Sequence, residues 1–372
     1  MLHIQYNKEL FLINILVYII SMYVAQPYTT FQNPQRNNEN KGVTTFFFLL
    51  IINSVFAFWA ADTYHSWEAF KIAQTFSFYE IEDYEGIYNW LATVCNNEYF
   101  LWRAFIWVPA CMFMYYTAKQ LKLQNKNLLV AILLFGSFLS NTRGMLGHAM
   151  MLLGAVLFAD KNNAIVKKII GLLIIFASYY FHKSMFINIL FAIVALFPMG
   201  KKSFIASFLA FPFLTILATR LIGGIVSGEI EMALGQGVGG AGDRTETYAS
   251  GEKAELNAYG VIFLLLNIVP QYLALFFLYK EIIVKKLFSK DNIYHYLYRL
   301  TYVAYYIGSL FFFVETSDAI YYRLKYMGVF PLVFVLGKVI STKQHTSKFF
   351  KFIMLMQFFG IFFRFAYKLY KW

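Results

Sequence analysis

Long apolar runs, separated by short polar segments, follow one another along almost the whole chain. Crossing the hydrocarbon core of a bilayer takes about 20 apolar residues of α-helix, and helices satisfy their backbone polar groups internally in lipid. The pattern therefore predicts an all-α polytopic membrane protein with about twelve transmembrane helices, in a single transmembrane domain over residues 1–372. The predicted spans are 10–26, 44–60, 99–118, 128–140, 145–159, 168–181, 184–199, 204–220, 258–279, 294–314, 319–340 and 348–365.

Two of the apolar runs are short for a complete crossing. The runs "LLVAILLFGSFLS" and "IIGLLIIFASYYF" have 13 residues each, which is about 20 Å of helix against a hydrocarbon core of about 30 Å. Each run leads into a polar turn, NTRG or HKS. Because short or interrupted apolar segments point to binding sites in membrane proteins, we expect short re-entrant or dipping turns on the extracytoplasmic side.

Composition and charge agree with a membrane protein of defined orientation. Hydrophobic residues make up 59% of the chain and charged residues only 14%, whereas a soluble domain has about 25% charged residues. The net charge of +12 comes from lysines in alternate connectors, such as Lys119 and Lys161, which marks those connectors as cytoplasmic. The basic balance is therefore a topology signal, and nucleic acid is not an expected partner. Three positive residues do not fit this orientation: Arg364, Lys368 and Lys371.

Polar residues that interrupt the apolar pattern gather on the predicted outer side. They are Asp62, Arg143, His182, Lys183, Arg244, Glu315, Asp318 and Arg323. The two long loops, 61–98 and 221–257, belong to the same side. We therefore expect binding or chemistry at the outer face. Few ionisable residues fall in the inner halves of the spans, and Arg103 and Arg299 are two that the pattern does not place.

Several of these polar residues have a second, purely structural interpretation. Lysines near helix ends often extend to the lipid headgroups, so Lys183 and Lys325 are candidates either for headgroup contact or for binding. His182 is either a packing residue or part of a pocket. His148 lies about one helical turn after Arg143 and could share its face.

Other sequence features resemble cofactor sites without their context. His65 and Glu68 form an H-x-x-E pair, but no third ligand is apparent, so no metal is expected. "GQGVGG" over 235–240 matches a dinucleotide motif, yet it lies in an outer loop rather than between a strand and a helix. We interpret it as a flap over a cavity or as a plain loop. Cys95 and Cys111 are too few for a disulfide framework and are expected to pack in the core.

Four segments occur in a set order: "ADTYHSWEAF", "NTRGMLGHAMMLLGAVLFADK", "YYFHKSMFINILFAIVALFP" and "SDAIYYRLKYMGVFPLV". Together they resemble, over about residues 44–340, the EpsG family of bacterial exopolysaccharide polymerases, which are Wzy-like. The family pattern falls on Asp62 and Tyr64, on Arg143, on the His182–Lys183–Ser184 turn and on Arg323. "RGMLGH" departs from the family, which often has Arg-Gln-Gly and small residues there.

The resemblance implies a GT-C-like membrane fold and a glycosyltransferase activity. Such a polymerase joins oligosaccharide repeat units carried on undecaprenyl diphosphate, at the outer face of the bacterial cytoplasmic membrane, to make O-antigen, capsule or exopolysaccharide. Expected partners are the lipid-linked oligosaccharide and membrane lipid, with a chain-length regulator protein as a further candidate. Because the lipid diphosphate is already an activated leaving group, neither a metal nor a cofactor is expected.

The same resemblance assigns the cations to the lipid diphosphate. Arg143 and Arg323 are expected to bind it, because the planar guanidinium donates bidentate hydrogen bonds to phosphate. Lys183 or Arg244 is expected to supply a third cation.

The reaction also needs a base and a sugar-binding surface. His182, which titrates near neutrality, or Asp62, which begins the acidic outer loop, is the expected base for the acceptor hydroxyl. Tyr64 and Trp67 are candidates for stacking on sugar faces, although membrane-interface belts also use such aromatic residues. No carboxylate nucleophile is evident, so a single inverting displacement is preferred.

Two other classes of membrane protein share some of these features. A lipid-linked oligosaccharide flippase or transporter would have the same spans and an arginine-lined cavity, but it needs a path open to both sides. A membrane acyltransferase would also use an intramembrane histidine, with an acyl donor that comes from the cytoplasm. The outer placement of the polar residues favours the polymerase.

Overall fold

The computed structural model describes residues 8–25, 70, 86–96, 98–123, 125–135, 142–181, 185–226, 261–262, 264–288, 293–312, 318–340 and 347–371. For some helical residues, Arg143 and Arg323 among them, it describes the backbone only. The predicted span 44–60, most of loop 61–98 and loop 221–257 beyond residue 226 lie outside the described residues.

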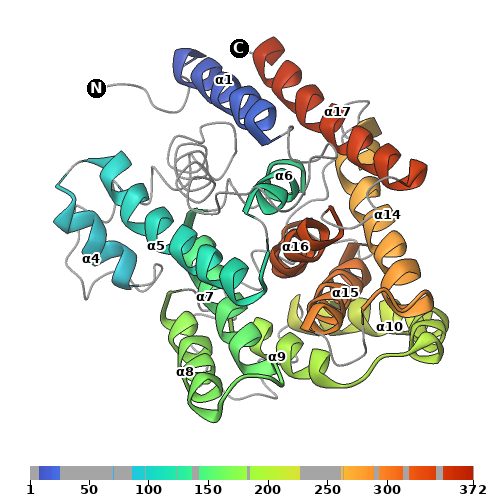
Figure 1. The fold of residues 1–372 in the computed structure, drawn as a ribbon. Helices are drawn as coiled ribbons and strands as arrows, with labels where there is room; N and C mark the ends of the chain where they lie inside the picture. Colours follow the sequence, from blue (N-terminus) through green and yellow to red (C-terminus); the bar gives the residue numbers. More distant parts are fainter. Residues whose placement is uncertain are drawn as a thin grey trace, which may run out of the picture.

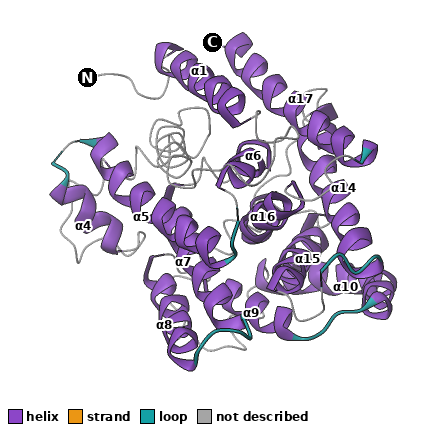
Figure 2. Ribbon diagram, viewed as in Figure 1, coloured by secondary structure: helices purple, strands orange, loops and turns teal. Residues whose placement is uncertain are grey.

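The described residues form helices joined by turns and include no strand, so the all-α prediction is confirmed (Figures 1 and 2). The helices are α1 (Lys8–Ala25), α4 (Gly86–Val94), α5 (Tyr99–Gln120), α6 (Asn125–Phe135), α7 (Thr142–Ala159), α8 (Ile165–Phe181), α9 (Met185–Leu196), α10 (Lys201–Val226), α14 (Val269–Leu278), α15 (Ile293–Phe312), α16 (Asp318–Ile340) and α17 (Lys348–Lys371). Two π-helical segments, η5 (Leu264–Ile268) and η6 (Tyr279–Val284), extend α14 at its two ends.

Every predicted span except 44–60 overlaps one of these helices. Within the described part of the chain, three segments are long and apolar enough to cross a membrane: Lys201–Arg220, Leu265–Val284 and Lys348–Ala366. The predicted shortness stays untested for α6, because residues 136–141 after its last residue, Phe135, lie outside the described residues. It does not hold for α8, which begins earlier than predicted and has 17 residues, about 26 Å of helix.

Helix α16 lies at the centre of the bundle (Figure 1). It packs against α6, α7 and α15, and almost every side chain described over residues 324–340 is buried. A helix that is apolar on all sides is expected in such a central position. By contrast, α8 and α10 expose large apolar side chains such as Phe176 and Phe208, as helices facing lipid do.

Three contacts gather the basic connectors at one end of the bundle. Gln120 Nε2 donates a hydrogen bond to Asn163 Oδ1 at 2.8 Å. Tyr294 OH donates to the Leu121 carbonyl at 2.9 Å, and Lys338 Nζ lies 5.6 Å from the centroid of the Tyr294 ring. The end of α5, the connector after α7, the start of α15 and the end of α16 therefore meet at what we call the basic end. Its assignment to the cytoplasm stays a prediction.

Arg299 belongs to this basic end and has a structural role. Its Nε donates a hydrogen bond of 2.8 Å to the carbonyl of Ala195, in the last turn of α9. Cations commonly satisfy the carbonyls that a helix leaves unpaired at its C-terminus. Because α9 ends at the basic end, its start lies at the opposite end, together with the starts of α5, α7 and α16.

Candidate functional site

Two of the predicted site residues open neighbouring helices at the end opposite the basic end. Arg143 is the second residue of α7 and Arg323 lies five residues after the start of α16. These two helices pack against each other. The backbone thus brings the two arginine positions to the same end of the bundle, as the sequence predicts. The other predicted site residues lie outside the described residues: Asp62, Tyr64, Trp67, His182, Lys183 and Arg244.

Below Arg143, three helices converge on the buried side chain of His148. The His148 ring stacks on Phe330 of α16, with the ring centroids 5.1 Å apart. Asn188 of α9 places its Nδ2 at 3.1 Å from His148 Nδ1. An amide nitrogen donates, so this contact is a hydrogen bond when Nδ1 is the unprotonated ring nitrogen. His148 therefore ties α7 to α9 and α16 within the core.

Lys325 is buried two residues after Arg323 on α16. It is only 4% exposed, so the alternative in which it extends to the headgroups is wrong. Arg364 of α17 lies close enough to Lys325 to repel it electrostatically. Its Nη2 donates a hydrogen bond of 3.3 Å to Asn267 Oδ1. Two basic side chains from different helices thus lie within electrostatic range of each other inside the bundle.

A further buried cation, Arg103, lies one turn after the start of α5. It is fully buried, its Nη1 donates a hydrogen bond of 3.3 Å to Tyr99 OH, and its Cζ lies 5.9 Å from the centroid of the Tyr99 ring. The pattern analysis left this arginine unplaced. The available signal is its position between Trp102 and Trp107 near a helix start, which suggests burial among aromatic rings rather than exposure.

The depth of these groups is similar when it is measured along the helices. His148 lies six residues from the start of α7, Lys325 seven residues from the start of α16, and Arg364 seven residues from the end of α17. At 1.5 Å per residue these positions are about 9 to 10 Å below the helix ends, and Arg103 is about 6 Å below. The basic residues Lys325, Arg364 and Arg103 therefore form what we call the cationic layer, beneath one surface of the bundle.

Such a layer is suited to an anionic group that enters from that surface. Guanidinium and ammonium groups in a partly desolvated site attract phosphate more strongly than they do in water. Among the described residues, no group of three His, Cys, Asp or Glu side chains could hold a metal ion.

The Cys95 thiol lies outside this layer, directly after α4. It is buried, at 2% exposure, and unpaired with any other cysteine. Burial raises its pKa above the ordinary thiol value, because an apolar environment disfavours the thiolate. Cys111 is also a buried free thiol, so both cysteines are packing residues, as predicted.

A comparison with protein families finds a match to the model described as the EpsG family over residues 41–371. No curated protein and no solved structure matches the chain.

Proposed function

The chain belongs to the EpsG family, which is related to the Wzy-like polysaccharide polymerases, and from this membership we propose its reaction. The protein joins oligosaccharide repeat units carried on undecaprenyl diphosphate, at the outer face of the bacterial cytoplasmic membrane. It is an inverting, metal-independent glycosyltransferase embedded in that membrane by many helices. The observation that carries the proposal is the layer of cations beneath one end of a helical membrane bundle.

The chemistry requires one bond to form and one to break. The acceptor hydroxyl of one repeat unit attacks the anomeric carbon of the growing chain, and the bond from that carbon to the diphosphate oxygen breaks. The base, His182 or Asp62, takes the hydroxyl proton. Undecaprenyl diphosphate leaves with the electron pair, and Arg143 and Arg323 stabilise the charge that develops on it.

The described helices supply support for this assignment of the arginines. The backbone positions of Arg143 and Arg323 share one end of two packed helices. Lys325, Arg364 and Arg103 add positive charge at that same end, and Lys183 or Arg244 is assigned as a further cation. Each cation near the leaving group lowers the cost of releasing a diphosphate.

A flippase and a membrane acyltransferase, the two rival classes, would each need polar groups in other places. A flippase needs polar groups along a path to both surfaces, but Arg299, at the basic end, is engaged with a helix carbonyl. An acyltransferase needs its histidine to be reachable from the cytoplasm. Labelling of cysteines introduced at Ser184 and Thr142 separates the two topologies. Access from the outside supports the polymerase, and access from the cytoplasm alone favours the acyltransferase.

Reconstitution tests the reaction directly. The purified protein in lipid vesicles, given only undecaprenyl-diphosphate-linked repeat units, should produce a ladder of longer glycans and release undecaprenyl diphosphate. The reaction should proceed without nucleotide sugar, ATP or divalent metal. A ladder that requires a nucleotide sugar would make the protein a synthase instead. No ladder, together with movement of the lipid across the bilayer, would make it a flippase.

A further inference from the structure

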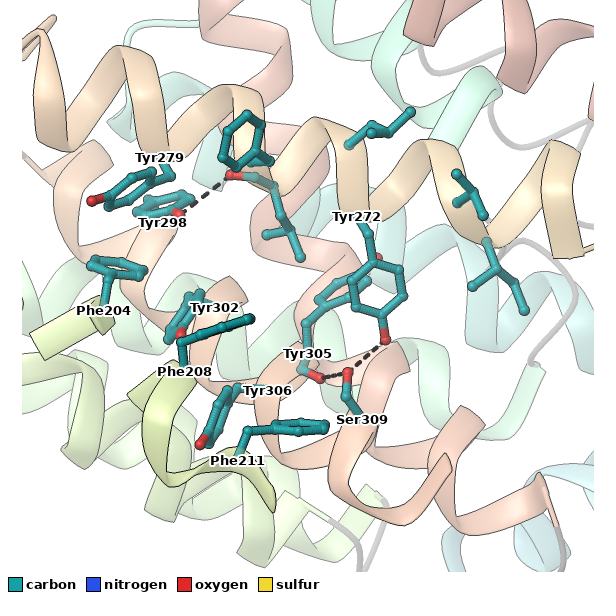
Figure 3. Close-up of a pocket in the computed structure, with 15 residues that line it drawn as sticks. Phe204, Phe208, Phe211, Tyr272, Tyr279, Tyr298, Tyr302, Tyr305, Tyr306 and Ser309 are labelled. Carbon is teal, nitrogen blue, oxygen red and sulfur yellow. Dashed lines mark hydrogen bonds between the residues drawn. The ribbon is translucent and has the colours of Figure 1, made fainter. Parts of the chain in front are cut away.

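A cavity of about 680 Å³ lies between α10, η5–α14–η6 and α15 (Figure 3). Its wall is almost entirely aromatic and aliphatic. The aromatic residues that line it are Phe204, Phe208, Phe211, Tyr272, Phe276, Tyr279, Tyr298, Tyr302, Tyr305 and Tyr306. A wall of this kind offers ring faces and few groups that could orient a polar ligand.

The hydroxyl groups in the wall are largely engaged with the protein itself. Tyr302 OH lies 2.6 Å from Ser207 Oγ, and Tyr272 OH lies 2.7 Å from Ser309 Oγ. Tyr305 OH donates to Gln271 Oε1 at 2.9 Å. Because these hydroxyls already have partners, a ligand that needs hydrogen bonds would gain little here. The cavity therefore suits an apolar occupant.

The cavity opens sideways, at the exposed apolar surface of α10 and α14, which we expect to face lipid. At its mouth Phe208 is 79% exposed and Phe276 is 60% exposed, whereas Tyr298 and Tyr305 at its back are each 1% exposed. A chain lying in the bilayer can therefore enter without passing through water.

The cavity is long in the direction of the helices. Along α15 its wall runs from Tyr298 to Ser309, a rise of about 16 Å, close to the depth of about 15 Å for one leaflet of the bilayer core. This length suits an extended apolar chain, and we call the cavity the groove.

The groove adjoins the cationic layer at two places. The Tyr305 ring lies against Gly328 on α16, where an added Cβ would be 2.6 Å from the ring, and Gly328 is one turn after Lys325. Ile268 of the groove wall directly follows Asn267, which accepts the hydrogen bond from Arg364. An amphiphile with an anionic head and a long apolar tail would therefore meet cations and groove together.

We propose that this groove binds the isoprenoid chain of the lipid-linked substrate, with the diphosphate toward Lys325 and Arg364. The identity of the lipid rests on the proposed function, whereas the apolar lining, the sideways opening and the adjacent cations come from the structure alone. The chain is already out of water in the bilayer, so ring packing and the charged head, rather than the hydrophobic effect, set its preference for the groove.

Photocrosslinking provides the test, with a matched control on the same helix. Benzoylphenylalanine replaces Phe208, which lines the groove, or Phe213, which is 75% exposed on α10 but does not line it. The full-length protein is placed in nanodiscs of phosphatidylethanolamine and phosphatidylglycerol with a small fraction of tritiated undecaprenyl diphosphate. We expect the crosslinked ratio of undecaprenyl diphosphate to phospholipid to be about tenfold higher at 208 than at 213.

A second pair of variants checks that the enrichment depends on the groove. In the protein labelled at 208, Leu273→Trp fills the groove and should remove the enrichment. Leu265→Trp makes the same change on η5 outside the groove, where Leu265 is 48% exposed, and should retain it. Equal ratios at 208 and 213 would overturn the proposal, as would phosphatidylglycerol enriched in place of undecaprenyl diphosphate.

The outcomes of this test and of the polymerisation test are distinguishable. Enrichment at 208 without a glycan ladder would support lipid binding in the groove and contradict the proposed polymerase activity. A ladder without enrichment at 208 would support the polymerase activity and contradict lipid binding in the groove.

Discussion

Substitution of Gly154 by alanine should weaken the contact between α7 and α8. A Cβ at this position would lie 2.6 Å from the carbonyl oxygen of Gly171 and 2.7 Å from Ile175 Cγ1. Ordinary contacts begin at 3.4 Å, so the alanine methyl is about 0.8 Å too close to a backbone atom. The oxygen belongs to helix α8 and cannot rotate away, so the two helices must separate.

The size of the stability loss in Gly154→Ala follows from two opposed effects. Overpacking at a close helix contact costs about 1–3 kcal/mol, and alanine returns up to about 1 kcal/mol because it favours the helix more than glycine does. The unfolding free energy should therefore fall by about 1–2 kcal/mol. Since 1.4 kcal/mol corresponds to a factor of about ten, the folded-to-unfolded ratio should fall about tenfold. Because Arg143 and His148 are carried on α7, the shift should also lower polymer yield.

Unfolding by SDS in mixed micelles, followed by tryptophan fluorescence, measures the loss. Gly200→Ala is the matched control, because no atom lies within 4 Å of a Cβ there, and its effect should stay within about 0.5 kcal/mol. Ile175→Ala should not rescue Gly154→Ala, since the Gly171 oxygen remains. Identical midpoints for Gly154→Ala and Gly200→Ala would refute the packing argument.

The remaining predictions concern the proposed chemistry and the buried thiol. Arg143→Lys should reduce polymerisation nearly as much as Arg143→Ala, because lysine lacks the planar fork; normal polymer length in both variants at wild-type expression would remove the assignment. Alanine at the true base, His182 or Asp62, should abolish polymerisation while lipid-linked substrate still binds, and full activity in both variants would exclude both residues. Cys95 should react with maleimide more slowly than Thr93→Cys, an exposed position nearby, and its rate should keep rising at pH values above the ordinary thiol pKa, because burial raises the Cys95 pKa. Equal rates at pH 7 would contradict that burial.

Hydropathy alone predicted the helical class and the approximate position of nearly every helix in the described chain. The boundary of α8 was missed because Lys167 and Lys168 interrupt the apolar run, whereas the helix continues through them from Ile165. Lysines at the basic end extend a helix beyond the apolar core without entering it. Helix α4 was missed because its nine residues are too few to register as a span.

The candidate site was predictable in part. Arg143 and Arg323 lie near the starts of α7 and α16, and both helices start at the same end of the bundle. The distribution of lysine and arginine among the connectors is enough to predict this. The burial of Lys325 depends on its approach to α17, and no local pattern reports which helix packs beside it. Arg103 was missed for a similar reason, because Tyr99, which accepts its hydrogen bond, packs on Phe70, a residue distant in sequence.

The contacts of His148 favour a structural role for this residue. Its Nδ1 lies 3.1 Å from the Asn188 amide nitrogen. The ring is also buried and stacked on Phe330, in surroundings where an unpaired charge would cost free energy. His148 is therefore suited to hold α7, α9 and α16 together, and the proposed base stays His182 or Asp62.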